Sequence, residues 1–130
     1  MIGFRLDRRS NVVPYLQIVE QVRDALRTGL LETGDRLPTV RDVASSLAMN
    51  PNTVLKAYRQ LEHDGLVEGR PGQGTFVVRS LAGPSLAGQA TLRRELVAWL
   101  GRAREAGLPY EDIQALMGTT LHAFEAEGAA

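Results

Sequence analysis

The stretch from residue 39 to residue 79 constrains the fold of this chain more than any other part. Two short segments with apolar residues at helical spacing meet at the polar tetrapeptide NPNT, residues 50–53. Two runs rich in β-branched and apolar residues follow, Leu66–Glu68 and Thr75–Arg79, and the Gly-rich sequence GRPGQG separates them. This order predicts a short helix, a tight turn, a second helix and a β-hairpin.

Both of these helices have a recognisable start. Thr39, followed three residues later by Asp42, predicts a capping box for the first helix. Asn50 is the expected N-cap of the second helix, and Pro51 lies in its first turn, where a missing N–H costs little. Gly65 is the expected stop. The predicted inward face of the second helix consists of Val54, Ala57, Tyr58 and Leu61.

A longer amphipathic helix is expected before these elements, opening at Pro14 and ending at Gly29. Alternating residues from Phe4 to Asp7 predict a short strand and a loop ahead of it. Three helices followed by a hairpin is the order of a winged helix-turn-helix. We therefore expect a mainly α fold with a small β-hairpin, in which residues 1–80 form a DNA-binding domain.

The remainder of the chain predicts a linker and a helical tail. Residues 81–88 mix Ser, Gly and Pro with small apolar residues, which favours a linker, and residues 89–130 contain two further apolar stripes at helical spacing. About 40 residues rarely form a stable unit alone. We therefore expect the tail to form a homodimer through these stripes, which consist of Leu92, Leu96, Trp99, Leu100, Ile113, Leu116, Met117, Leu121 and Phe124.

Composition excludes several classes of protein. The chain has no cysteine, so disulfides and thiolate metal sites are excluded. Its apolar runs are too short to cross a membrane, so we expect no membrane partner. Nothing at the start resembles a signal peptide, which favours a cytoplasmic protein. His63 and His122 lie far apart in sequence, and no Ser, His and acid grouping stands out. We therefore expect no enzyme activity, metal site or cofactor.

Charge neither demands nor forbids a nucleic-acid partner. The 15 basic and 15 acidic residues cancel, although residues 1–80 carry 11 Lys and Arg against 9 Asp and Glu. A helix whose first turn offers free N–H groups and polar side chains nevertheless suits the major groove. Asn52, Thr53 and Lys56 are candidate contacts on the predicted second helix of the turn, Arg41 on the helix before it, and Arg70 in the hairpin.

The segment GDRLPTVRDVASSLAMNPNTVLKAYRQLEHDGLVEGRPGQGTFV resembles the DNA-binding signature of the GntR family of bacterial regulators. The resemblance covers about residues 10–79 and includes the leading helix PYLQIVEQVRDALRTG. It implies that the second and third helices and the wing contact double-stranded DNA. The residues so implied are Thr39, Arg41, Asn50, Asn52, Thr53, Lys56, Arg70, Gly72, Gln73 and Gly74. Pro51 and Leu55 depart from the pattern, because many members carry basic residues there, so base specificity does not transfer.

The short tail resembles that of the YtrA-type branch, in which it serves dimerisation, whereas most branches append a large ligand-binding domain. The resemblance implies a dimeric repressor on a palindromic operator. Two recognition helices would then lie about 34 to 36 Å apart, or a multiple of that distance. A small-molecule effector could lodge only between the winged domain and the tail or in the dimer seam, and no residue set marks its pocket.

The alternative function is a winged-helix module that binds protein and has no DNA readout, for which the near-zero net charge is the best support. Single features also have simpler explanations. Arg59 is expected to be a solvated side chain, and Tyr58 and Trp99 are expected in the core or in the dimer contact. The pair of glycines at Gly72 and Gly74 is a weak signal for a phosphate loop, since no P-loop Lys or Ser follows.

Overall fold

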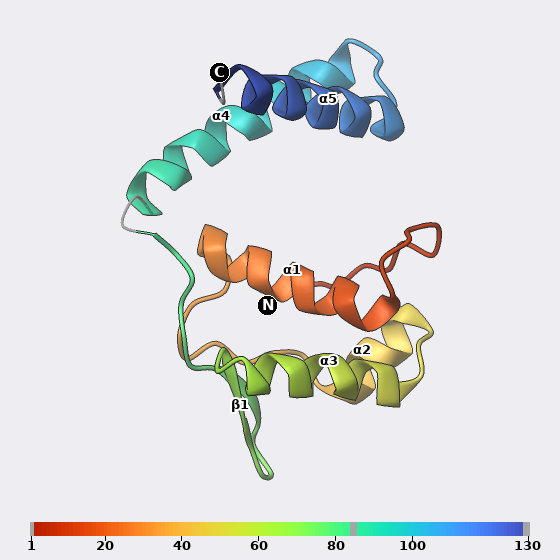
Figure 1. Ribbon diagram of the computed structural model, residues 1–130, viewed down its shortest axis with the longest axis vertical. Coiled ribbons are helices and arrows are strands. Elements are labelled where there is room, and N and C mark those ends of the chain that lie inside the picture. The colour runs from red at the N-terminus through yellow and green to blue at the C-terminus, as the bar shows by residue number, and fades with distance from the viewer. Residues whose placement is uncertain (1, 84–85, 129–130) are drawn as a thin grey trace. The chain divides into compact units, whose positions relative to one another are not determined.

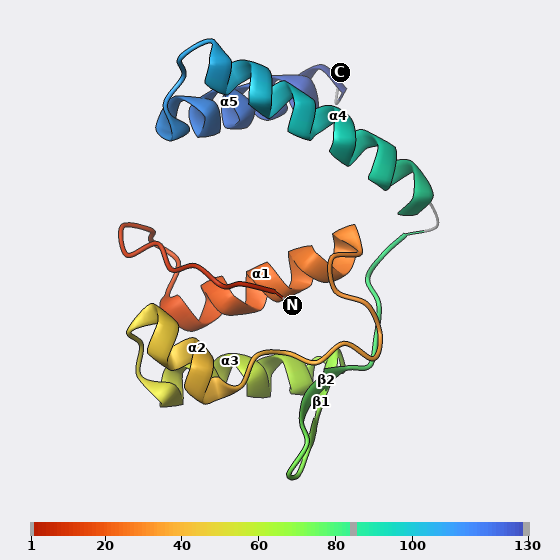
Figure 2. The same ribbon diagram turned by 180° about the vertical axis from the view of Figure 1, so that it is seen from behind.

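The computed structural model describes residues 2–83 and 86–128, drawn from opposite sides in Figures 1 and 2. These residues form two compact units, an N-terminal unit that ends at Leu86 and a helical tail that begins at Ala87. The N-terminal unit contains α1 (Pro14–Thr28), α2 (Val40–Leu47), α3 (Pro51–His63), β1 (Val67–Arg70) and β2 (Gly74–Val77). The tail is formed by α4 (Leu86–Glu105) and α5 (Tyr110–Gly128).

The core of the N-terminal unit lies where α1 and α2 pack on α3 (Figure 1). Ile18, Val22 and Leu26 on α1 meet Val54 and Leu61 on α3, and all five are fully buried. The apolar stripes of the helices are thus removed from water, which is the main favourable term in folding. The predicted inward face of α3 is confirmed, because its buried residues are Val54, Ala57, Tyr58 and Leu61.

The two predicted helix caps are confirmed. The Thr39 hydroxyl accepts a hydrogen bond from the Asp42 N–H at 3.1 Å, and the Asn50 side-chain oxygen accepts one from the Asn52 N–H at 2.8 Å. Ala48 ends α2 in the left-handed region with φ 51°. The left-handed Ala48 at the end of α2 and the Asn50 cap at the start of α3 give a short turn between the two helices.

The hairpin is antiparallel and pairs Val67 with Val77 and Arg70 with Gly74. Its strands begin and end nearer the tip than the sequence predicted. Only three residues close the turn, in which the Gln73 N–H donates to the Arg70 carbonyl oxygen at 2.9 Å. Arg36 adds a bridge to Phe76 on the outer side of β2. The hairpin protrudes from the helices beside the C-terminal end of α3 (Figure 2).

The predicted strand from Phe4 to Asp7 was wrong, since these residues are extended but have no strand partner. Side-chain amides on α1 form hydrogen bonds with the backbone of this segment in place of a partner strand. Gln21 accepts from the Arg5 N–H at 3.0 Å and donates to the Arg5 carbonyl oxygen at 2.8 Å, and Gln17 makes the same pair of bonds with Asp7 at 2.9 Å each. The segment before α1 is therefore held to α1 through side chains.

The tail consists of two helices and has very little interior. Leu108 donates its N–H to the Ala103 carbonyl oxygen at 3.2 Å, and Gly107, with φ 93°, lets the chain turn back there. Among the described residues of the tail, only Ala103 is buried. The helix α4 starts inside the stretch that the sequence predicted as a linker. No helix in the described ranges is long and apolar enough to cross a membrane.

Candidate nucleic-acid interface

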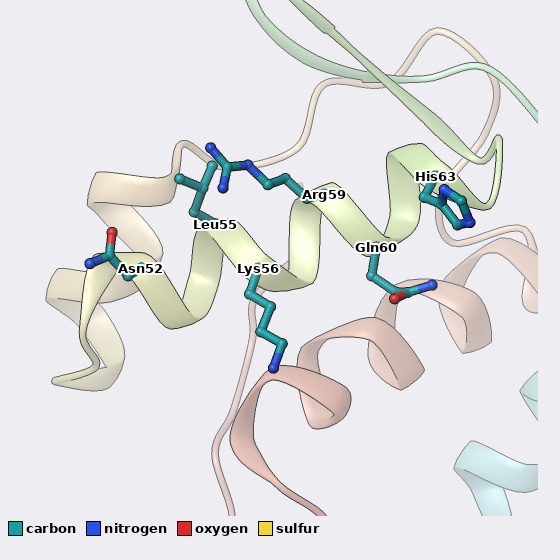
Figure 3. Close-up of a pocket in the computed structure, with 6 residues that line it drawn as sticks. All are labelled: Asn52, Leu55, Lys56, Arg59, Gln60 and His63. Carbon is teal, nitrogen blue, oxygen red and sulfur yellow. The ribbon is translucent and has the colours of Figure 1, made fainter.

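The exposed surface of α3 presents two sets of side chains (Figure 3). Asn52, Leu55 and Arg59 extend to one side, away from α1, whereas Lys56 and Gln60 extend toward α1. The Lys56 Nζ lies 4.2 Å from the centroid of the Tyr15 ring at the start of α1, a cation–π arrangement. Asn52, Lys56 and Arg59 are exposed and Thr53 is half-buried.

The predicted contacts around the turn lie at the N-terminal ends of α2 and α3. Thr39 and Arg41 are exposed at the start of α2, and Asn50 is exposed as the cap of α3. The Thr39 hydroxyl accepts one hydrogen bond within its own helix and keeps its proton for an outside acceptor. The N–H groups of Asn52 and Thr53 donate to the side-chain and backbone oxygens of Asn50, and the helix dipole adds a local positive potential at this end. These groups together suit an anionic partner such as a phosphate.

Three hydrogen bonds join residues at the two ends of α2 to the segment ahead of α1 and to α3. The Arg8 guanidinium donates to the carbonyl oxygens of Leu47 and Ala48 at 3.1 and 3.3 Å. The Tyr58 hydroxyl, on the buried side of α3, donates to the Pro38 carbonyl oxygen at 2.5 Å. Burial raises the pKa of the Tyr58 phenol above its ordinary value, so the hydroxyl keeps its proton. These hydrogen bonds hold α3 in place, so its outer surface has a fixed position within the N-terminal unit.

The hairpin carries its own cationic surface. The Arg70 Cζ lies 4.5 Å from the centroid of the Phe76 ring, and one Arg70 nitrogen is 4.0 Å from a Glu68 oxygen. Gly72 and Gln73 are exposed at the tip. The predicted hairpin contacts lie next to one another at this tip: Arg70, Gly72, Gln73 and Gly74. They are separated in sequence from the predicted contacts on α3.

Arg36 belongs to the same face of the hairpin, and the sequence analysis missed it. Arg36 is paired with Phe76, and Arg70 is paired with Gly74 two residues earlier on β2, so both arginines lie on one face. A Cβ atom at position 74 would lie 2.8 Å from the Arg36 Nε, and φ is +124° there. Gly74 therefore makes room for the Arg36 guanidinium. Only the pairing of residue 36 with β2 could have revealed this.

The cations of this surface are largely free of acidic partners. Within the described residues, the ion pairs are Arg23 with Asp64 at 3.7 Å and Arg70 with Glu68 at 4.0 Å. Arg36, Arg41 and Arg59 belong to neither pair. In the same part of the chain, no group of three or more His, Asp or Glu could hold a metal ion. The arrangement can bind an anionic polymer by charge and hydrogen bonds.

The tail offers a second and chemically different surface. A groove of about 590 Å³ is lined mainly by apolar side chains, with Gly118 and Thr120 among them. Six of the nine predicted dimer contacts line it: Leu96, Trp99, Leu116, Met117, Leu121 and Phe124. Leu92 is exposed outside the groove, and Leu100 and Ile113 are half-buried. Phe124 is 70% exposed, which leaves a large apolar surface in water.

Comparison with known sequences finds a match over the N-terminal unit and into the tail. The family model described as bacterial regulatory proteins, gntR family, matches residues 14–77. The HTH-type transcriptional repressor YtrA of Bacillus subtilis (strain 168) is 36% identical over 91 residues, which are 70% of this chain and 70% of that protein.

Solved structures give the same result for the fold. YtrA from Sulfolobus acidocaldarius, described as a GntR-family transcription factor, is similar over 92% of this chain and 97% of that chain, with 27% identity and a TM-score of 0.54. The AraR DNA-binding domain, solved in complex with operator ORX1, is similar over 58% of this chain and 95% of that chain, with 25% identity and a TM-score of 0.51.

Proposed function

Because the chain belongs to the gntR family of bacterial regulatory proteins and is a YtrA-type transcriptional regulator, we propose that it is a homodimeric repressor that binds a palindromic operator. The Bacillus relative is named as a transcriptional repressor, which supports the direction of regulation. The AraR domain in complex with its operator supports DNA as the partner of the N-terminal unit. The observation that carries the proposal is the exposed first turn of α3, capped by Asn50 and flanked by cations without acidic partners.

The N-terminal end of α3 enters the major groove in this proposal. Asn52 and Thr53 reach base edges, because amide and hydroxyl groups can both donate and accept hydrogen bonds there. Thr39 and Asn50 donate to phosphate oxygens at the edge of the groove, and Arg41 binds a phosphate or a guanine. Lys56, held over the Tyr15 ring, supplies charge near the backbone.

The hairpin follows the DNA backbone into the adjacent minor groove. Its tip has a small cross-section at Gly72 and Gly74, and Gln73 is exposed between them. Arg70 supplies the charge for this contact, supported on the Phe76 ring. Arginine is the side chain that a narrow minor groove attracts most strongly.

The apolar groove of the tail pairs with its equivalent on a second chain. Its exposed Leu121 and Phe124 need a cover, and a two-fold packing of α4 and α5 would provide one in the manner of a helical bundle. We accordingly assign residues 1–80 to DNA binding, residues 81–88 to a linker and residues 89–130 to dimerisation. Two chains would then present two α3 helices to the two half-sites of an operator.

A titration of a labelled duplex from the chain's own promoter region, followed by fluorescence anisotropy, tests this function. We expect affinity to fall by at least about tenfold between about 50 and about 200 mM salt, since bound phosphates release counterions. Arg41→Ala should weaken binding by about 1 to 3 kcal/mol if Arg41 contacts a base. Absence of binding by the wild-type chain at low salt would refute the proposal. The alternative, a module that binds protein, would be favoured if binding to a protein partner survived the joint replacement of Asn52, Thr53 and Lys56.

A further inference from the structure

The two side chains of α3 that stay positively charged have different surroundings. Lys56 is directed toward α1, with its Nζ 4.2 Å from the centroid of the Tyr15 ring. Arg59 is exposed, extends away from α1 and takes part in neither ion pair of the described residues. The cation that sequence analysis regarded as solvated is therefore the one whose side chain is free to meet a partner.

Arg59 lies on the same surface as the first turn of α3. Asn52, Leu55 and Arg59 extend to the same side of the helix in Figure 3. They line a shallow hollow of about 430 Å³ together with Lys56, Gln60 and His63. Their spacing of three and four residues places them in one stripe, and helical side chains lean toward the N-terminus of their helix. Arg59 thus extends the surface of Asn52 by about two turns, roughly 10 Å along the axis.

The position of this stripe relative to the core determines which part of DNA it can reach. The buried face of α3 consists of Val54, Ala57, Tyr58 and Leu61. At about 100° per residue, Asn52 lies about 170° and Arg59 about 150° from the centre of this face. Lys56 lies about 150° away on the other flank, where its side chain extends toward α1. When a helix lies in the major groove, the stripe opposite its support faces the base edges, and its flanks face the phosphates. A guanidinium in that stripe can make two parallel hydrogen bonds to guanine O6 and N7.

We propose that Arg59 is a further specificity-determining residue of the DNA interface and that it contacts a guanine. This inference rests on the proposed binding of operator DNA by α3. Each chain of the dimer would contact one guanine in this way. That guanine would lie about two turns of α3, roughly 10 Å, from the base that Asn52 contacts. The planar donors of the Arg59 guanidinium make the contact specific. Lys56 differs, because its ammonium lies over the Tyr15 ring.

The test compares Arg59→Gln with Arg27→Gln, which removes the same charge from an exposed position in the last turn of α1. Anisotropy titrations use the promoter duplex and a panel in which each G·C pair is replaced by A·T. We expect Arg59→Gln to bind the promoter about tenfold or more weakly and to lose discrimination at one G·C pair in each half-site. Arg27→Gln should bind within about twofold of the wild type and keep all discrimination.

A second variant separates base contact from simple charge. Arg59→Lys keeps the charge but loses the two-pronged geometry, so we expect it to lose the same discrimination as Arg59→Gln. Thermal unfolding of each variant verifies that it is folded at the titration temperature. A uniform loss of affinity across the panel by Arg59→Gln, with a salt slope lowered by about one and full recovery of affinity by Arg59→Lys, would overturn the guanine contact, because charge alone would explain it.

The outcomes also separate this inference from the proposed function. A wild-type chain that binds the promoter, together with an Arg59→Gln variant that binds as the wild type does, would overturn the role of Arg59 and leave the function intact. A wild-type chain that does not bind the promoter duplex would overturn both.

Discussion

The N-terminal unit and the tail are both built from amphipathic helices, yet they differ in where their apolar side chains lie. Val54 and Leu61 in the N-terminal unit are fully buried, whereas Leu92 and Phe124 in the tail are 64% and 70% exposed. Three helices and a hairpin approach the first core from several directions, but two helices can shield only one side of each other. The difference indicates that the first unit has a closed core within one chain, and the exposed side chains of the tail support the proposal that it packs against a second chain.

The sharpest test of this contrast is a matched pair of truncations. Leu61→Ala should lower the free energy of unfolding of the N-terminal unit by about 2 to 5 kcal/mol, because it leaves a cavity in a closely packed core. Leu30→Ala, at a position 59% exposed, should change it by less than about 0.5 kcal/mol. Urea unfolding monitored by circular dichroism measures both. Equal effects of the two changes would contradict the view that this unit has a closed core.

Leu121→Glu tests the tail in the opposite way. A charge introduced in the apolar groove should weaken self-association by about tenfold or more, because it would be desolvated in the dimer contact. Gln114→Glu, which adds the same charge at an exposed polar position of α5, is the control. Sedimentation equilibrium measures the dimer dissociation constant. A dimer of unchanged affinity in the Leu121→Glu variant would place the contact elsewhere.

Replacement of a cap tests the junction on which the candidate interface depends. Asn50→Ala removes the acceptor of the Asn52 N–H and should lower the free energy of unfolding by about 1 kcal/mol. Asn11→Ala, outside the helices, should have a smaller effect. Thermal unfolding compares the two variants, and a stability of Asn50→Ala equal to that of the wild type would show that the cap bond contributes nothing.

The smallest expected effect concerns Tyr58. Tyr58→Phe removes the hydrogen bond to the Pro38 carbonyl oxygen and should cost about 1 kcal/mol near neutral pH. Burial raises the pKa of this phenol in the folded state, so its stabilising contribution is present below the ordinary pKa of about 10 and is lost as pH rises above it. The wild type should therefore lose more stability than Tyr58→Phe above about pH 10.

The control for this titration is Tyr110→Phe, at a ring 68% exposed on α5. Urea unfolding at several pH values between about 8 and about 11 compares the three proteins. A wild type and a Tyr58→Phe variant whose stabilities run parallel over this range would contradict the assigned role of burial.

The elements of the N-terminal unit were predictable because their signals are local. The apolar spacing of Val54, Ala57 and Leu61 predicted the buried face of α3. The residue types at Thr39 and Asn50 predicted the N-caps of α2 and α3. The strand predicted at residues 4–7 failed, because the alternation could not show that side-chain amides of α1 would satisfy its backbone.

The details of the candidate site depended on contacts that are distant in sequence. The direction of Lys56 is set by the Tyr15 ring on another helix, and the place of Arg36 is set by its pairing with Phe76. Neither contact leaves a mark in the local pattern around residue 56 or residue 36. For the same reason, sequence analysis, which took Lys56 as a DNA contact and Arg59 as a solvated side chain, could not show that Lys56 extends toward α1 and Arg59 away from it.

The central claim is that the N-terminal unit binds DNA while the tail joins two chains, so that one operator takes one dimer. Sedimentation of the full chain with a fluorescent duplex from its own promoter region tests this directly, in wild-type form and with Leu121→Glu. We expect two wild-type chains on each duplex and an affinity at least about tenfold weaker for the variant, since its chains must bind separately. One chain per duplex, with equal affinity for both proteins, would contradict the account.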